Sequence, residues 1–145
     1  MTLKEAAEKH LATWPLYNSG NHEVSTRTLN NGGEWLGYRT ASVNQITKYT
    51  HFDVNRIEKI FFILSIYLEQ KHRGKGHGDA LYKVLEAIAE EIGCSKVQMM
   101  PSGWTSTGET RRDYLLRRGY RVFGTEVVKD VSLKASSKSS ALKGE

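Results

Sequence analysis

The alternation of hydrophobic and polar positions along the first third of the chain predicts one helix and one hairpin. Residues 3–14 repeat apolar side chains at the spacing of one helical face. Thr2 precedes this segment and Pro15 follows it, and these residue types are suited to begin and to end a helix. Two β-prone runs then flank Asn31-Gly32, a dipeptide typical of tight hairpin turns. We therefore expect a helix followed by two antiparallel strands.

The most apolar stretch of the chain is rich in β-branched and aromatic residues and too short for a buried helix of normal length. Residues 60–68 are therefore predicted to form a central strand that is covered on both faces. Residues 79–92 repeat apolar positions at helical spacing, and Gly93 is suited to end that helix. The elements expected elsewhere are a loop with a short helical turn over 44–58, a strand at 96–100, a helix from about 107 to 118, and a last strand over 120–131 interrupted at Gly124.

The order of elements from residue 60 onward is strand, helix, strand, helix, strand. A strand–helix–strand unit is expected to be right-handed with parallel strands, whereas the hairpin before it is antiparallel. The predicted fold class is therefore α/β with a mixed sheet, in a single domain over residues 1–130. Residues 131–145 are rich in serine and lysine and nearly free of large apolar side chains, so we expect a flexible basic tail.

Composition and charge narrow this picture only slightly. The formal net charge of +5 suits an anionic ligand or nucleic acid, but much of the excess lies in the tail, so it is weak evidence for nucleic-acid binding. No apolar run approaches the about 20 residues that a membrane span needs, and the N-terminus lacks the layout of a secretory signal. The single cysteine, Cys94, rules out an internal disulfide and is expected in the core, which fits a reducing, cytoplasmic location.

The candidate chemistry lies in the stretch QKHRGKGHG, residues 70–78, between the apolar strand and the helix after it. The start of a helix presents backbone N–H groups without internal partners and carries a partial positive charge. Glycines at 74, 76 and 78 allow the loop to curl and to bring further N–H groups toward one point. The stretch therefore predicts an anion site suited to a phosphate, and more specifically to a pyrophosphate.

Basic side chains strengthen this prediction, because Arg73, Lys75 and His77 lie within the same stretch. Two common phosphate motifs are excluded. The Walker pattern GxxxxGK[ST] is absent, and the dinucleotide fingerprint GxGxxG is not met.

The spacing Arg73-x-x-Gly76-x-Gly78, after an apolar strand and before an amphipathic helix, resembles the (Q/R)xxGx(G/A) signature of the GNAT superfamily of acyl-CoA N-acyltransferases. The likeness extends backward to Leu68, where the family often has valine, although Gln70 stands where proline is common. It extends forward to GCSKVQMM, which resembles the family's splaying strand, and to YLLRRGY, which resembles its helix ending in GF. The likeness covers residues 60–128.

This resemblance implies a GNAT-like fold with splayed parallel central strands, and acetyl-CoA as co-substrate between the strands at 60–68 and 96–100. Family members carry a bulge in the first strand; by position, the N–H of Ile66 would face the thioester carbonyl and Leu68 would pair with the pantetheine amides. The cofactor-binding residues implied are Ile66, Leu68, Arg73, Gly74, Lys75, Gly76, His77 and Gly78. The amine attacks the thioester directly, so no metal is expected, and the sequence holds neither HExxH nor paired CxxC.

The resemblance to the GNAT superfamily indicates the catalytic acid and the catalytic base less clearly. Family members often use a tyrosine four residues before the glycine of GF, which is Leu115 here, with Tyr114 one residue further from Gly119. Tyr114 is our candidate acid, and a packed aromatic is its alternative role. The glutamate that some members carry on the first strand is Phe62 here. The remaining candidates for the base are His51, Asp53, Glu58 and a water chain.

The function favoured by the sequence is transfer of acetyl from acetyl-CoA to a primary amine of a small molecule, a peptide or a protein lysine. The departures at Leu115 and Phe62 leave open a catalytically weakened CoA-binding sensor or interaction module. A third hypothesis, a basic nucleic-acid-binding domain, would need a clustered basic face. Its candidates are Arg111, Arg112, Arg117 and Arg118. Many relatives pair through edge strands, so a homodimer also stays open.

Overall fold

The computed structural model describes residues 1–15, 21–42, 45–46, 50–66, 74–105 and 107–131. The helices in this part of the chain are α1 (Leu3–Leu11), α2 (His77–Glu91) and α3 (Arg111–Arg117). The strands are β1 (Asn21–Thr28), β2 (Glu34–Ser42), β3 (Gln45–Ile46), β4 (Thr50–Asn55), β5 (Ile60–Ser65), β6 (Lys96–Met99), β7 (Arg121–Phe123) and β8 (Glu126–Asp130). The predicted basic tail lies outside the described residues, apart from Val131.

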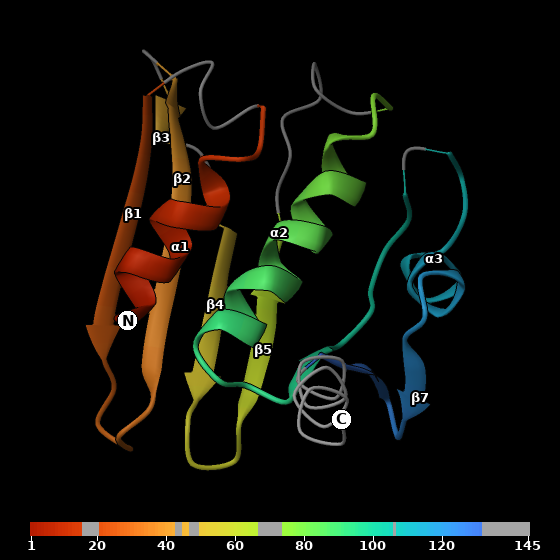
Figure 1. The fold of residues 1–145 in the computed structure, drawn as a ribbon. Coiled ribbons are helices and arrows are strands. Elements are labelled where there is room, and N and C mark those ends of the chain that lie inside the picture. Colours follow the sequence, from red (N-terminus) through yellow and green to blue (C-terminus); the bar gives the residue numbers. More distant parts are fainter. Residues whose placement is uncertain (16–20, 43–44, 47–49, 67–73, 106, 132–145) are drawn as a thin grey trace, which may run out of the picture.

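The strands form one mixed sheet in the order β1-β2-β4-β5-β6-β8-β7, with β3 paired to β2. β5 and β6 are parallel, and the other neighbouring pairs are antiparallel. α1 and α2 lie in front of the sheet and against each other, and α3 contacts β8 (Figure 1). The predicted α/β class with a mixed sheet is confirmed.

The helix boundaries follow the capping signals of the sequence. Thr2 and Glu5 cap α1 reciprocally: the Glu5 N–H donates to Thr2 Oγ1 at 3.1 Å, and the Thr2 N–H donates to Glu5 Oε1 at 3.0 Å. α2 ends before Gly93, whose φ of +88° is left-handed, and the Cys94 N–H donates to the Ala89 carbonyl at 2.9 Å. The predicted cap at Gly93 and the buried position of Cys94 are confirmed.

The prediction for residues 44–58 was wrong, because this segment contains β4, which lies between β2 and β5. Phe52 and Val54 are buried, whereas His51 and Asp53 are half-buried on the opposite face of the sheet. This alternation has the period of two residues that defines a strand. It spans only six residues and was therefore hidden among polar neighbours.

Two predictions near the C-terminus are also corrected. α3 begins at Arg111 rather than near residue 107, because Thr105 and Glu109 first close a turn; the Thr105 N–H donates to the Glu109 carbonyl at 2.8 Å. Thr110 then caps the helix, since its side chain accepts the Asp113 N–H. The expected last strand is a hairpin of β7 and β8 that turns at Gly124, where φ is +64°.

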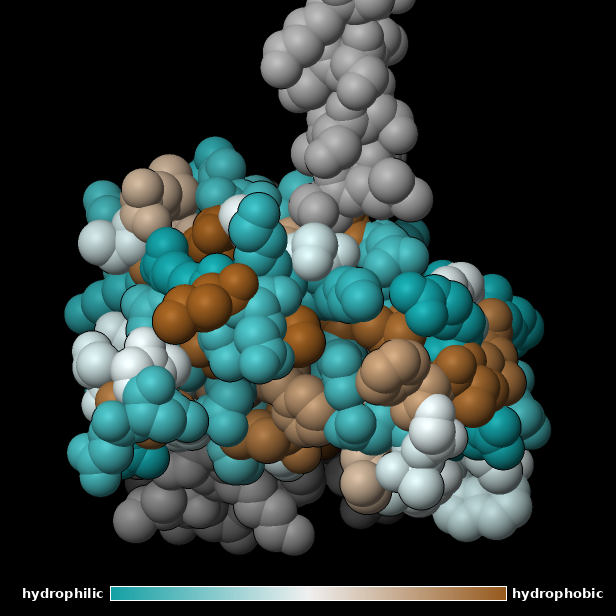
Figure 2. All heavy atoms as spheres, turned by 90° about the horizontal axis from the view of Figure 1, so that it is seen from below, coloured by the Kyte–Doolittle hydropathy of each residue, from teal (hydrophilic) through white to brown (hydrophobic). Residues whose placement is uncertain are grey.

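The core lies between the helices and the sheet and includes side chains from α1, α2, α3 and the central strands. Figure 2 views the end of the molecule that carries the β4–β5 turn, where hydrophobic residues form separate patches among hydrophilic ones. None of the helices in the described residues is long and apolar enough to cross a membrane.

Replacing Phe52 with alanine tests the position of β4 in the core. Its side chain is 1% exposed and its ring lies 5.2 Å from that of Phe61, so Phe52→Ala should lower the free energy of unfolding by about 3–5 kcal/mol. Ile57, in the turn after β4, is 92% exposed, and Ile57→Ala should change that free energy by less than about 0.5 kcal/mol. Urea denaturation measures both, and similar losses for the two variants would contradict the buried strand.

Candidate functional site

The parallel strands β5 and β6 separate at their carboxyl ends. Their pairing stops at Ile63 and Met99, where β6 also ends. β5 continues to Ser65, which pairs with His51 of β4 after a register shift. The shift leaves Leu64 as one extra residue on β5, which is a β-bulge. The parallel pairing therefore ends one residue before the bulge, and this unpaired end of β5 and β6 is here called the splay.

The cofactor residues predicted at the end of β5 are only partly described. Ile66 follows β5 directly, lies beyond the last residue that pairs with β6, and is half-buried against the core. Leu68 and Arg73 lie outside the described residues. A strand edge that has lost its neighbour beside a bulge can offer its backbone groups to a ligand.

The start of α2 is suited to bind an anion. Its N-cap is Gly76 with a φ of +82°, Gly74 has a φ of +77°, and no side chain of the described residues caps this end. A Cβ added at Gly78 would meet no described atom within 4 Å, and the φ of Gly78 is not left-handed, so the described residues do not require glycine there. Glycine within a helix lowers stability.

The basic residues of this turn differ in their surroundings. Lys75 is exposed beside the N-cap and adds positive charge at the helix start. His77 is half-buried as the first residue of α2, and its carbonyl accepts the indole N–H of Trp14 at 3.0 Å. This bond ties the segment after α1 to the first peptide of α2.

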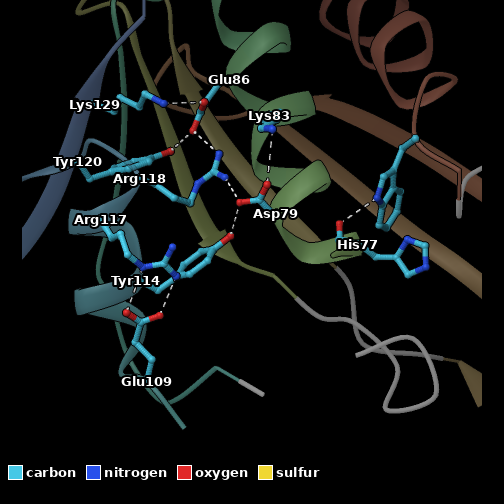
Figure 3. A network of polar contacts seen from close by, with 11 residues as sticks. His77, Asp79, Lys83, Glu86, Glu109, Tyr114, Arg117, Arg118, Tyr120 and Lys129 are labelled. Atoms are coloured by element: carbon cyan, nitrogen blue, oxygen red, sulfur yellow. Dashed lines mark hydrogen bonds and ion pairs between the residues drawn. The ribbon is translucent and has the colours of Figure 1, made fainter. Parts of the chain in front are cut away.

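Tyr114, the candidate acid, reaches the first turn of α2. Its hydroxyl donates to Asp79 Oδ1 at 3.0 Å, and Asp79 is the third residue of α2 (Figure 3). Leu115 is fully buried in the core. The one-residue step between the two turns the side chain by about 100°, so Leu115 packs inside and Tyr114 lies over the helix start.

The proton on Tyr114 is held firmly, whereas Asp79 is ionised. Burial, together with the hydrogen bond to Asp79, raises the pKa of Tyr114 to about 12, against the opposing charge of Arg118. Burial works to raise the pKa of Asp79, but the Tyr114 hydroxyl, Arg118 and Lys83 outweigh it and leave that pKa below its usual range. At neutral pH the pair is therefore a neutral phenol donating to a carboxylate.

Arg118 joins this pair to a larger charged network that sequence reasoning missed. Its guanidinium pairs with Asp79 and lies 3.4 Å from Glu86 Oε2, and the side chain is 9% exposed. Glu86 also accepts the Tyr120 hydroxyl at 2.8 Å and Lys129 Nζ at 3.0 Å. Asp79 and Glu86 stand seven residues apart on one face of α2, a spacing that could have indicated a shared partner.

The arginines proposed as a nucleic-acid surface do not form a free basic face. Arg118 is buried in the network, and Arg117 pairs with Glu109 at 3.0 Å. Arg111 donates to the Ser102 carbonyl and to the Tyr82 hydroxyl, each at 3.1 Å. Three of the four charges thus have partners within the chain.

The three side chains considered as the base lie at different distances from the splay. His51 pairs in register with Ser65 beside the bulge, and its Nδ1 lies 3.4 Å from the indole N–H donor of Trp35. Asp53 lies two residues further along β4, where it pairs with Phe62. Glu58 is exposed in the turn at the opposite end of β4. Within the described residues, no three His, Cys, Asp or Glu side chains are grouped to hold a metal ion.

Comparisons with known proteins point to one family. The model of the "Acetyltransferase (GNAT) family" matches residues 3–120. The chain is similar in structure to nourseothricin acetyltransferase, with a TM-score of 0.46 and 11% identity over 77% of this chain and 85% of that one. It is also similar to an acetyltransferase from Bacillus cereus ATCC 14579, with a TM-score of 0.42 and 16% identity over 85% of this chain and 89% of that one. No curated protein matches the sequence.

Alanine at two glycines of the α2 start should change stability in opposite directions. Gly76 is left-handed at φ +82°, so Gly76→Ala should lower the free energy of unfolding by about 1–2 kcal/mol. Gly78→Ala should raise it by up to about 1 kcal/mol, since the added methyl meets no neighbour and alanine favours the helix. Urea denaturation measures both. A stability loss in Gly78→Ala would mean that the fold itself requires that glycine.

The titration of Tyr114 provides a second test of this geometry. The folded state should keep its proton up to about pH 12, while a tyrosine in the unfolded chain ionises near 10.0. The stability that this proton contributes is therefore complete below pH 10.0 and is lost as the pH rises toward about 12. The tyrosinate absorbance of the wild type minus that of Tyr114→Phe isolates this group, and a midpoint near the unfolded value would contradict the assignment.

Proposed function

The chain belongs to the GNAT acetyltransferase family, and from this premise we propose that it is an N-acetyltransferase that moves acetyl from acetyl-CoA to a primary amine. The observation that carries the proposal is a helix start with glycine at its N-cap, which follows β5 in the chain after the pairing of β5 with β6 has ended. A helix N-terminus favours the charge of a diphosphate, and a splayed strand pair offers backbone groups to the pantetheine arm.

The binding roles are divided between the turn and the strand edge. The backbone N–H groups of Gly76, His77 and Gly78 would receive the diphosphate, with Lys75 adding charge from the exposed side of the turn. Arg73 and Leu68 keep the roles implied by the motif. The space above Gly78 supports this arrangement, because no described atom lies within 4 Å of its missing Cβ.

The reaction needs a hydrogen-bond donor to the developing oxyanion and a second donor to the sulfur of the leaving thiolate. The amine nitrogen attacks the thioester carbon, the C–S bond breaks, and CoA leaves as a thiolate. The N–H of Ile66 would face the carbonyl oxygen, and such a donor is worth about 3–4 kcal/mol. Tyr114 would donate to the sulfur, for which its one O–H would turn from Asp79 to the ligand. Its pKa of about 12 lies above the about 8.5 of a thiol, which favours a hydrogen bond over complete proton transfer.

The incoming amine must also lose a proton, and His51 is the best-placed candidate for that base. It stands opposite Ser65 at the bulge, one residue from Ile66, and Trp35 steadies its ring. Asp53 and a water chain are the alternatives, whereas the opposite end of β4 places Glu58 away from the splay. The acceptor is a primary amine of a small molecule, a peptide or a protein lysine.

A catalytically weakened CoA-binding module is the second candidate. Phe62 in place of a carboxylate, and the buried Leu115 in place of a tyrosine, favour it. Such a module would bind CoA as the enzyme does, but it would not transfer acetyl and would therefore release no thiol with any amine.

Calorimetric titration with CoA and a thiol-release assay with acetyl-CoA over a panel of amines separate these functions. We expect the wild type to bind CoA and to release thiol with at least one amine. Tyr114→Phe should bind CoA within about threefold of the wild type and turn over at least about tenfold more slowly. Failure to bind CoA would refute both functions, and binding without thiol release would favour the module.

A further inference from the structure

We propose that Arg118 is a positioning residue of the cofactor site, because it draws the Asp79 carboxylate away from the start of α2 and so leaves that start open to a diphosphate. This inference rests on the proposed function, since it takes the diphosphate of CoA as the ligand of α2. It adds a role for a residue that lies outside the glycine turn, at the end of α3.

Asp79 is an unusual neighbour for an anion site. It is the third residue of α2, within the first turn, where the helix attracts any negative charge. A carboxylate at this position can occupy the same N–H groups that a diphosphate needs. If it stays ionised beside a bound diphosphate, it also repels that ligand. An aspartate in the first turn is therefore compatible with anion binding only if its carboxylate points away from the helix start and its charge is paired with a cation.

The structure shows both conditions. Asp79 Oδ1 accepts the Tyr114 hydroxyl at 3.0 Å and pairs with Arg118, while Oδ2 lies 3.6 Å from Lys83 Nζ (Figure 3). These partners belong to α3 or to the next turn of α2. None of the hydrogen bonds that Asp79 accepts in the described part of the chain comes from a backbone N–H.

Arg118 is fixed well enough to hold the carboxylate in that direction. Its side chain is 9% exposed, and its guanidinium lies between Asp79 and Glu86. The Tyr82 and Tyr114 rings flank it, with centroids 5.3 and 5.8 Å from the guanidinium carbon. Lys129 pairs with Glu86, so the two carboxylates, Asp79 and Glu86, are balanced by the two cations, Arg118 and Lys129. Lys83, in contrast, is exposed and forms the longer contact.

A purely structural ion pair between α2 and α3 would have a different signature. It predicts that loss of Arg118 weakens the fold and that further removal of Asp79 restores no function. The positioning role predicts that Asp79, once released, interferes with ligand binding. Removing its charge should then restore CoA affinity even though Arg118 is still missing. The two roles are separated by a double-mutant cycle read out by affinity rather than by stability.

The experiment titrates CoA calorimetrically into the wild type, Arg118→Gln, Asp79→Asn and the double variant. Arg118→Gln should weaken CoA binding by about tenfold or more, because an unpaired like charge then lies beside the ligand. Asp79→Asn should bind CoA at least as tightly as the wild type, and the double variant should return to within about threefold of Asp79→Asn. Arg121→Gln is the matched control, since Arg121 pairs with Asp130 on the exposed C-terminal hairpin, and it should leave affinity unchanged.

Two outcomes overturn the inference: Arg118→Gln binds CoA like the wild type, or the double variant binds as weakly as Arg118→Gln. If Arg118→Gln alone does not fold, Arg118→Gln with Glu86→Gln is the background, because it removes a half-buried carboxylate that has lost one of its two cationic partners. The same recovery on adding Asp79→Asn is then required. A wild type that binds no CoA would refute the proposed function itself, whereas equal binding by all variants would refute only the role of Arg118.

Discussion

The loss of pairing between two parallel strands organises the rest of this molecule. β5 and β6 hold together as far as Ile63 and Met99, and beyond that point the bulge at Leu64 bends β5 while only β4 follows it. A parallel pair must be joined by a crossover, so α2 has to start at the same end of the sheet at which the pair separates. The order of elements along the chain alone therefore places the start of α2 at the end of the sheet where β5 and β6 cease to pair.

Electrostatics decides whether that place can hold an anion. The backbone of α2 supplies a positive end, but the chain also puts a carboxylate, Asp79, within its first turn. Arg118 and Tyr114 engage that carboxylate from the side. α3 has only seven residues and would not be stable as an isolated helix. Its buried Leu115 and the ion pair of Arg118 with α2 hold it against the core, and the proposed anion site would depend on the same contacts.

The strand, turn and helix around Gly76 could be read from the sequence because each depends on neighbours within a few residues. Apolar runs, glycines that tolerate left-handed φ and a helical repeat are local signals. β4 was missed because its alternation occupies only six residues and is flanked in the sequence by polar residues. The contacts of Arg118 join residues 39 and 32 positions apart, and no local period encodes such a pairing. The same limit applies to Tyr114, which lies one residue from the position where the family often has its tyrosine. Only the structure shows that Leu115, at that position, is buried in the core.

The hydrogen bond between the Trp14 indole and the His77 carbonyl has a consequence for tryptophan fluorescence. The indole is 2% exposed, and its N–H donates to the carbonyl of the first peptide of α2. Of the three tryptophans in the chain, Trp104 is 68% exposed, and Trp35 lies on β2 with its indole N–H toward His51. Indole emission responds to the electric field around the ring, and a charge bound at the helix start would change that field at Trp14. Trp14 would therefore serve as an intrinsic fluorescent reporter of anion binding at the start of α2.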